Sequence, residues 1–368
     1  MDNVGYEIDF LPVGNGDKSG DAIAIRYGTQ GNYKVMVVDG GTKESGQALV
    51  EHIKKYYQTD YVDYVVNTHP DQDHASGLTE VLNNLEVGEL WIHRPWLYVN
   101  EIVKHVDNSE TKFLRDKRTN IQSIKDRFQW EYYKYAKELE LIANKKGIAI
   151  KEPYEGCKIG DFIVLSPSKN WHLFNLIPNS DKTKEIQSME DSKPNFFKSS
   201  LEKLFSIDET LGFETLIDYG KTSRENESSV ILYANFNNRG ILLTGDAGNE
   251  ALQNAYDFAI YNGVDISKNL KFIQIPHHGS RRNVSPKILN QIIGAIGEKE
   301  KESITAFVSA GENDTNHPRK VVTNAFIRRG CMVIETRDNI ICHCNISKRD
   351  GWITAERIQF YDKVESYE

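Results

Sequence analysis

Cysteine is scarce in this chain, with only four among 368 residues. So few thiols exclude a scaffold held together by disulfides and favour a reducing compartment. Two of them, Cys342 and Cys344, flank a histidine in the stretch NIICHCNIS. A closed zinc site usually needs four ligands, and alternate residues of a strand share one face. We therefore expect both cysteines to be buried as small apolar residues.

Long apolar runs and an excess of positive charge are also missing. No run of about 18 apolar residues occurs, so no transmembrane helix is expected, and the N-terminus lacks the pattern of a signal peptide. We expect a cytoplasmic protein that does not bind membranes. The formal net charge of −8 argues against a protein that coats nucleic acid with its whole surface. It is compatible with a local basic groove.

Strand and helix patterns alternate along both halves of the chain. Residues 6–13, 21–28 and 33–41 have the β-branched content and Gly/Asn/Asp punctuation of a β-meander. Helical spacing follows at 46–57 and 74–85, and short apolar strands are expected at 62–68 and 87–96. In the second half, strands are expected at 228–236, 239–248, 269–280 and 304–311, with helices at 249–260 and 285–296. Two similar β-rich halves predict a layered α/β sandwich with helices outside.

Two polar segments interrupt this pattern. We interpret residues from about 97 to 147 and from about 170 to 228 as insertions in a single domain of residues 1–368. The alternative is that they are ordinary core helices and a surface loop. Basic residues of the first segment, including Lys125 and Arg127, could extend a nucleic-acid track on which Tyr133 stacks bases. The simpler alternative is a solvated helix face.

Polar clusters that directly follow apolar strands are the candidate sites. The densest is NTHPDQDHASGL, which contains His69, Asp71, Asp73 and His74. Imidazole and carboxylate together suit zinc, iron or manganese, and on a turn that leads into a helix these side chains can converge. Asp73 could instead be a simple N-cap, but that explains one residue of four.

Four further clusters follow other strands. Asp39 is either a turn residue or an outer-shell partner of the metal site, and Asp246 taken alone could be an N-cap. Adjacent His277 and His278 point in different directions, so that one can bind a metal while the other supports it or contacts substrate. His317 before Pro318 is either functional or the start of a helix.

In order along the chain, these motifs resemble those of metallo-β-lactamase-fold hydrolases. They are most similar to the soluble hydrolase domain of bacterial DNA-uptake competence proteins of the ComEC type. LPVGNGD, MVVDGG, HPDQDH, ENESSVIL, ILLTGD, IPHHGS and GENDTNHP match successive family motifs. In HPDQDH, Asp71 replaces the middle histidine of the usual HxHxDH signature. The third-motif histidine has no clear equivalent, and His93 is better explained as a partner of the insertion.

The resemblance implies an αββα sandwich with one or two divalent ions at one edge of the sheets. Carried onto this sequence, His69 and Asp71 hold one ion, Asp73 and His74 a second, Asp246 bridges them and His277 completes the set. Asp39, Asn226 and Ser228 are expected in the outer shell. Because carboxylates favour harder ions, we expect Mn²⁺ or Zn²⁺, with Mg²⁺ as an alternative.

The expected reaction is hydrolysis of a phosphodiester in DNA or RNA. A hydroxide held by Asp73 and Asp246 is the expected nucleophile, and His278 or His317 would stabilise the oxyanion or protonate the leaving group. Phosphate would be bound by the basic residues near the later motifs, Arg281, Arg282, Arg319 and Lys320.

Two other functions stay open. One is a hydrolase of a small ester, lactone or cyclic nucleotide. The other is a non-catalytic binding module in a multi-protein system such as phage defence. The expected partners are accordingly a nucleic acid or nucleotide, together with a partner protein or a second copy of the chain.

Overall fold

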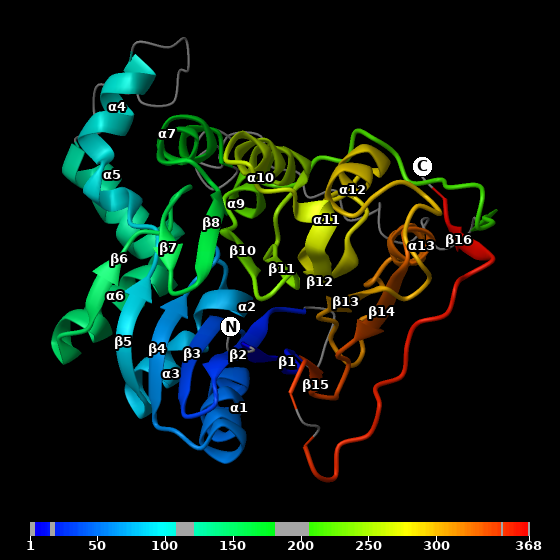
Figure 1. Cartoon of the computed structure of the whole chain (residues 1–368). Coiled ribbons are helices and arrows are strands. Elements are labelled where there is room, and N and C mark those ends of the chain that lie inside the picture. The colour runs from blue at the N-terminus through cyan, green and yellow to red at the C-terminus, as the bar shows by residue number, and fades with distance from the viewer. Residues whose placement is uncertain (1–3, 15–18, 108–120, 181–205, 347–348, 367–368) are drawn as a thin grey trace.

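The computed structural model describes residues 4–14, 19–107, 121–180, 206–346 and 349–366. Two seven-stranded sheets dominate it (Figure 1). In the first sheet the strand order is β15-β1-β2-β3-β4-β5-β6. Its strands are β1 (Gly5–Phe10), β2 (Ala22–Thr29), β3 (Asn32–Gly40), β4 (Tyr61–Val66), β5 (Glu86–Trp91), β6 (Ala149–Lys151) and β15 (Ile341–Cys344).

The second sheet follows the order β14-β13-β12-β11-β10-β8-β7. Its strands are β7 (Lys158–Ile159), β8 (Phe162–Ser166), β10 (Ile231–Asn235), β11 (Gly240–Leu243), β12 (Leu270–Gln274), β13 (Ile304–Val308) and β14 (Cys331–Glu335). A separate short pair joins β9 (Ser206–Asp208) to β16 (Lys363–Glu365). In each large sheet one part is antiparallel and the other parallel, so the carboxyl ends of several parallel strands meet at one edge.

Helices cover the outer face of each sheet. The first sheet packs against α1 (Lys43–His52), α3 (Leu78–Asn84) and α6 (Lys134–Lys146) through apolar side chains such as Leu49, Val81 and Leu139. The second packs against α10 (Asn249–Tyr261), α12 (Pro286–Ile292) and α13 (Lys320–Arg328). Between the sheets lies an apolar layer in which Phe10, Phe272 and Phe307 contact one another edge to face. This arrangement confirms the predicted αββα sandwich.

A helical lobe lies beside β5 and β6. It contains α4 (Val99–Asp107), α5 (Ile121–Arg127) and the π-helical turn η4 (Phe128–Tyr132), with η2 (Pro95–Leu97) at its start. Its own apolar cluster includes Trp96, Phe128 and Tyr133 from this segment, and Leu173 and Ile177 from η5 (His172–Leu176) and η6 (Ile177–Asn179). The first insertion and the start of the second therefore share one core. Tyr133 is buried there, so the prediction that it stacks bases is wrong.

The remaining short helices connect these layers. They are η1 (Ile53–Tyr57), α2 (Gln72–Ala75), α7 (Lys169–Trp171), α9 (Arg224–Glu227), α11 (Ile266–Asn269) and η8 (His277–Gly279). Among the helices of the described ranges, none is both long and apolar enough to cross a membrane.

One expectation about the strands is wrong. Cys342 and Cys344 lie on β15 as predicted, but both are half-buried. They are not in the apolar core because β15 is the edge strand of its sheet. Its inward-facing residue is His343, which stacks against Tyr6 and Phe272. Cys344 and Cys342 instead pair in register with the acidic residues Glu7 and Asp9 of β1.

Candidate metal centre and adjoining groove

Four histidines converge on one buried carboxylate. The Nε2 atoms of His69, His74 and His277 lie 3.8, 3.5 and 3.8 Å from Oδ2 of Asp246. The Nε2 atom of His278 lies 3.8 Å from Oδ1 of the same residue. These side chains come from the loop after β4, from α2, and from the turns that follow β11 and β12. The strand-end motifs of both sheets therefore meet at one place.

The ring of His69 is fixed by Thr68. The Thr68 hydroxyl donates to Oδ2 of Asp39 at 2.5 Å, so its oxygen is left to accept the proton on Nδ1 of His69, 3.0 Å away. Nε2 of His69 consequently carries a free lone pair that faces Asp246. A hydrogen bond that sets the tautomer in this way is typical of metal-binding histidines.

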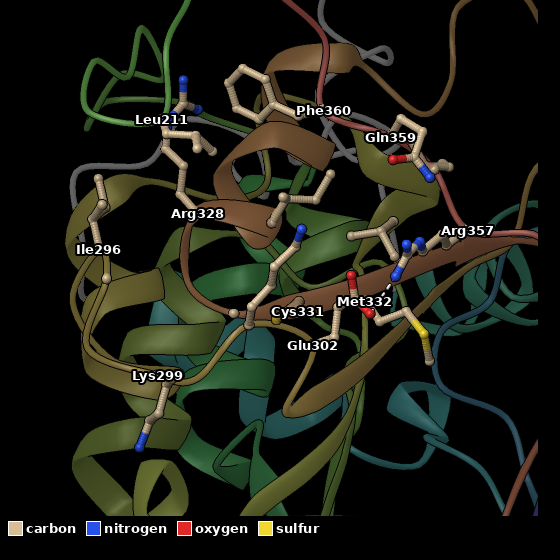
Figure 2. A pocket seen from close by; sticks show the side chains of 16 residues that line it. Leu211, Ile296, Lys299, Glu302, Arg328, Cys331, Met332, Arg357, Gln359 and Phe360 are labelled. Atoms are coloured by element: carbon tan, nitrogen blue, oxygen red, sulfur yellow. Dashed lines mark ion pairs between the residues drawn. The ribbon is translucent and has the colours of Figure 1, made fainter.

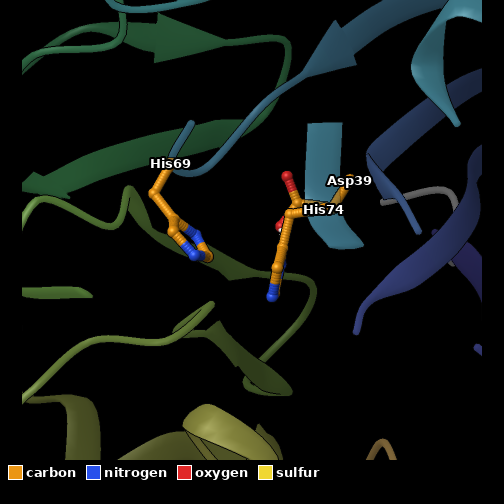
Figure 3. A group of neighbouring side chains, drawn as sticks. All are labelled: Asp39, His69 and His74. Carbon is orange, nitrogen blue, oxygen red and sulfur yellow. Dashed lines mark hydrogen bonds and ion pairs between the residues drawn. The ribbon is translucent and has the colours of Figure 1, made fainter. Parts of the chain in front are cut away.

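Asp39 also holds His74. Its Oδ2 accepts from Nδ1 of His74 at 2.8 Å (Figure 3). Its Oδ1 accepts from the backbone N–H of Thr68 at 2.7 Å. Asp39 itself has a positive φ of 55° at the end of β3. It is therefore both the turn residue and the outer partner that the sequence left as alternatives.

His277 and His278 owe their orientation to an unusual turn. Both have positive φ, of 46° and 56°, and Gly279 follows with 80°. A non-glycine residue in this region costs about 1–3 kcal/mol and persists only where its surroundings impose it. The turn aims both rings at Asp246. Nδ1 of His278 donates to the carbonyl of Ser309 at 3.2 Å, and Nδ1 of His277 lies 3.0 Å from Oδ1 of Asn283.

Buried atoms without hydrogen-bond partners mark the centre. Within the described residues, these include Nε2 of His69, Nε2 of His74 and Oδ1 of Asp246. Ligand atoms about 2.0–2.1 Å from a tetrahedral ion lie roughly 3.3–3.5 Å apart, close to the nitrogen–oxygen separations found here. An unpaired buried polar atom costs about 1–3 kcal/mol, and a cation would satisfy all three at once. The side chains therefore fit a divalent metal ion.

The acidic residues of the first motif lie around the same point. Oδ2 of Asp71 lies 3.8 Å from Nε2 of His69, and the side chain is about one-third exposed. Asp73 contributes an oxygen that lies with ligand atoms of His74 and His278 within 4.8 Å of one another. His69, His74 and His277 thus face Oδ2 of Asp246, and His278 faces Oδ1.

Electrostatics favour a neutral imidazole at two of the four histidines, His69 and His278. Burial lowers the pKa of His278 to about 3 and also lowers that of His69. Burial would lower the pKa of His74 as well, but Asp246 and Asp39 raise it well above its usual value. Despite burial, the neighbouring His74, His277 and His278 hold the pKa of Asp246 well below its usual value. With a pKa this low, His278 is a neutral imidazole near neutral pH, and its one proton lies on Nδ1, which donates to Ser309.

Several residues of the centre were not predicted. Asp21, directly before β2, lies 3.7 Å from Nδ1 of His74 and accepts hydrogen bonds from Ser309 and Gln274. Burial, together with the nearby acidic residues, raises its pKa to about 7. An acidic residue at the start of an apolar strand was the available signal. Ser229 accepts the backbone N–H of Asp246, whereas Ser228, the predicted outer-shell residue, donates to the carbonyl of Glu225.

Asn226 lies where the sequence predicted an outer-shell role. Its amide nitrogen is 2.7 Å from Nδ1 of His277.

His93 faces elsewhere, because it stacks on Tyr154 and His172 and contacts the carbonyl of Pro153. It is thus packed beside the inserted segment, as the sequence favoured, and does not supply the missing third-motif ligand.

A polar groove of about 690 Å³ opens beside the centre. Asp71, His277 and His317 line its inner end. Four basic residues line the rest, namely Lys221, Arg281, Arg282 and Arg319. Gly220 allows the two walls to approach, since a Cβ there would collide with the backbone of Arg282. Lys320 does not line the groove, because its Nζ lies over the ring of Tyr361.

His317 stands at the mouth of the centre. It donates through Nδ1 to Oδ2 of Asp314 at 3.1 Å and stacks nearly parallel to His277. Burial lowers its pKa even though Asp314 opposes that shift. A neutral ring held in this way presents a hydrogen-bond acceptor at Nε2.

A separate hollow among the described residues has none of these ligands on its wall. It has a volume of about 340 Å³ and lies between α13, β14 and the C-terminal residues 357–360, and an Arg357–Glu302 ion pair crosses it (Figure 2). No residue of the histidine cluster lines it, so it is not part of the metal centre. Arg115, Lys117 and Arg118, which could have extended a basic track, lie outside the described residues.

Comparison with known proteins supports this fold. Residues 16–149 match the family model described as the metallo-beta-lactamase superfamily, a segment that includes the first-motif ligands. This segment is therefore similar to that superfamily, whose members are mostly metal-dependent hydrolases. No curated protein matches the chain.

Two solved structures are similar to the chain. One is the metallo-beta-lactamase fold protein YhfI from Bacillus subtilis, with 8% identity, a TM-score of 0.39 and coverage of 93% of this chain and 100% of that one. The other is the metallo-beta-lactamase SMB-1 bound to 2-mercaptoethanesulfonate, with 11% identity, a TM-score of 0.31 and coverage of 74% and 82%.

Proposed function

We propose that this chain is a metal-dependent phosphodiesterase that cleaves nucleic acid. The observation that carries the proposal is the groove beside the histidine cluster, in which Lys221, Arg281, Arg282 and Arg319 line one continuous hollow. Guanidinium groups bind phosphate through paired hydrogen bonds, and four cations suit a substrate with more than one phosphate.

The charge distribution also supports an anionic substrate. The chain has a formal net charge of −8, whereas this groove is lined by four basic residues. Such a groove attracts polyanions to one place while the rest of the surface repels them. A lactam or a neutral ester would gain nothing from this arrangement.

The cluster residues would hold one or two divalent ions. We assign His69 and Asp71 to one position, Asp73, His74 and His278 to the other, and Asp246 to both. Divalent ions at such a centre lower the pKa of water and polarise a phosphoryl oxygen. His277, at the boundary between cluster and groove, completes the first position. Manganese or zinc suits this mixture of imidazole and carboxylate.

The side chains around the cluster have distinct tasks. Thr68 and Asp39 keep the Nε2 lone pairs of His69 and His74 directed at the centre, which requires no reorganisation when substrate binds. Arg282 and Lys221, which both line the groove, bind phosphates that flank the scissile bond. Nε2 of His317 accepts a proton or a hydrogen bond from the attacking water or from a substrate hydroxyl.

Hydrolysis of labelled DNA with added Mn²⁺ tests the proposal. Linear, circular and single-stranded substrates are compared with bis(p-nitrophenyl) phosphate and with p-nitrophenyl acetate. We expect cleavage of DNA by the native chain, loss of cleavage in Asp73→Ala, and no change in Lys271→Ala, since Lys271 is exposed on β12 and outside the groove. Turnover of the acetate alone would favour a small-ester hydrolase. No turnover of any substrate by metal-loaded protein would favour a binding module.

A further inference from the structure

Edge strand β15 places two thiols side by side, far from the metal centre along the sheet. Cys342 and Cys344 are two residues apart on a strand, so they share one face. Both are half-buried, and the thiol of Cys344 donates to the carbonyl of Ile346 at 3.8 Å. Neither takes part in the proposed hydrolysis.

A hollow gives small molecules access to this pair. It has a volume of about 260 Å³ and is lined by both cysteines, Arg349 and Trp352. Ile353, also on its wall, is 91% exposed. A reagent of the size of hydrogen peroxide can therefore reach the thiols without unfolding of the sheet.

The surroundings of the pair favour a thiolate on Cys344. The neighbouring Cys342 thiol lowers the pKa of Cys344 to about 7 against the effect of burial. The same interaction raises the pKa of Cys342. Arg349 also favours the thiolate, whereas Glu7 and Asp9 oppose it. Arg349 neutralises part of that opposition, because it contacts Glu7 at 3.1 Å and Asp9 at 2.7 Å.

We propose that Cys342 and Cys344 form a redox-active dithiol that peroxide converts reversibly into an intrachain disulfide. The thiolate of Cys344 attacks one oxygen of hydrogen peroxide, which gives a sulfenic acid and releases hydroxide. The thiol of Cys342 then attacks the sulfenic sulfur, so that the S–S bond forms and one water leaves. The dithiol loses two electrons and two protons, and the peroxide is reduced to water.

Strand geometry explains why the disulfide would be reversible. Two residues apart on a strand, the Cα atoms lie about 6.6 Å from each other. That is near the upper limit of about 6.8 Å for a disulfide. A bond formed at this separation is strained and easily reduced, as expected of a regulatory disulfide.

Mass spectrometry of the whole chain after brief exposure to hydrogen peroxide tests the proposal. Cys157 is the internal control, since it is also half-buried. We expect a peptide with a Cys342–Cys344 disulfide that dithiothreitol reverses, while Cys157 remains a thiol. Oxidation of Cys157 first, disulfides only between chains, or Cys344 as a sulfinic acid beside an intact Cys342 would each overturn the proposal.

The pH dependence of the reaction with a thiol reagent distinguishes a Cys344 thiolate with a lowered pKa from a thiol that reacts only because it is accessible to solvent. At pH 7 a thiol with a pKa of about 7 is half ionised, against roughly 3% for an ordinary thiol with a pKa of about 8.5. Its lower intrinsic nucleophilicity offsets about fivefold of this gain, so a rate about threefold higher remains. We therefore expect half-maximal reaction near pH 7 for Cys344 in the Cys157→Ser variant.

The variant Cys342→Ala removes the thiol that both lowers the pKa of Cys344 and forms the disulfide with it. Its midpoint should move towards pH 8.5, and dimedone should trap a sulfenic acid at Cys344 that native protein does not accumulate. Circular dichroism checks that the variant is folded. An unchanged midpoint, or no sulfenic acid in folded C342A, would contradict the proposed roles of the two thiols.

Discussion

One buried cluster of charged residues lies on the outer face of the first sheet, and a second lies where strand ends of both sheets meet; their differences are informative. The clamp cluster contains Glu7, Asp9, Arg26, His52 and Arg349, and it ties the C-terminal segment to the outer face of the sheet. The ligand cluster surrounds Asp246 at the strand ends. Both contain carboxylates and imidazoles that are almost fully buried. Burial of acidic groups alone therefore does not identify a metal site.

Their counter-charges distinguish the two clusters. In the clamp cluster, Arg349 makes paired hydrogen bonds to Asp9 at 2.9 and 2.7 Å, and Tyr57 donates to Asp9 at 2.6 Å. In the ligand cluster, the ion pairs that the described residues make with Asp246 involve histidines alone. The imidazole nitrogens there lie 3.5–3.8 Å from the carboxylate oxygens of Asp246, too far for hydrogen bonds. These distances suit atoms that bind a common metal ion. A divalent metal ion would supply the positive charge that an arginine supplies in the clamp cluster.

The largest effect is expected from Asp246→Asn. Loss of the shared carboxylate removes a ligand from both proposed positions, so bound metal should fall below one ion per chain. Phosphodiesterase activity should fall by about 10³-fold or more, because the ions supply the main electrostatic stabilisation. Metal analysis and DNA hydrolysis measure both effects, and Asp257→Asn, an exposed change on α10, is the control. Full metal content in D246N would contradict the assignment.

Asp9→Asn should instead destabilise the fold without changing metal content. Removing one partner of a buried ion pair costs about 3–5 kcal/mol, which urea unfolding can measure. Should metal affinity fall together with stability, the two clusters would not be independent.

Acidification should destabilise the native protein through the clamp cluster, because protonation of Asp9 removes the same negative charge as the Asp9→Asn substitution. Although burial acts in the opposite direction, His52 and Arg349 lower the pKa of Asp9 from 3.8 to about 2. A carboxyl whose pKa is lowered on folding stabilises the protein above its unfolded pKa, and this stabilisation is lost as pH falls through the folded pKa. We expect Asp9 to contribute about 2 kcal/mol that disappears between about pH 4 and pH 2. Unfolding free energies of native protein and D9N should converge over that interval, and a constant difference would contradict this account.

Thr68→Val should have an intermediate effect confined to the ligand cluster. It removes the hydroxyl that fixes the His69 tautomer through Asp39, and such outer partners contribute about 10–100-fold in metal affinity. Titration of metal into chelator-treated protein measures the change. Thr59→Val, a change at a partly buried residue before β4 and outside the ligand cluster, is the control. Equal affinity in T68V and native protein would show that Thr68 does not orient the ligand.

The smallest effect is expected from the groove. The double variant Lys221→Ala/Arg282→Ala should raise KM for DNA about tenfold with little change in kcat, since both residues bind flanking phosphates. The slope of log affinity against log salt should decrease by about 0.9 for each phosphate of duplex DNA that the variant no longer neutralises. Lys271→Ala again serves as the control. An unchanged salt slope with lower kcat would place these residues outside the substrate path.

The strand-end motifs predicted much of the centre, because parallel strands deliver their following residues to one sheet edge. His69, His74, Asp246 and the His277–His278 pair were all chosen on that ground. The orientation of the His277 and His278 side chains depends on three consecutive positive φ angles, at residues 277–279, which no residue pattern specifies. Ser229 could not be distinguished from Ser228 because the register of β10 decides which hydroxyl faces Asp246.

Long-range pairing was beyond the sequence argument. Asp9 and Arg349 are 340 positions apart, and nothing local indicates that they meet. The same limit explains the cysteines, since period-two alternation gives the face of β15 but not whether another strand or solvent covers it. The helical lobe shares a core with residues 173–177, and this depends on tertiary packing that no local pattern indicates.

Anomalous X-ray scattering from crystals of the chain grown with Mn²⁺ or Zn²⁺ tests the central claim most directly. The account predicts one or two peaks within bonding distance of Asp246, contacted by Nε2 of His69 and His74, with none in the clamp cluster. Crystals that hold metal only elsewhere, or protein that binds neither ion while His69 and His74 keep their positions, would contradict it.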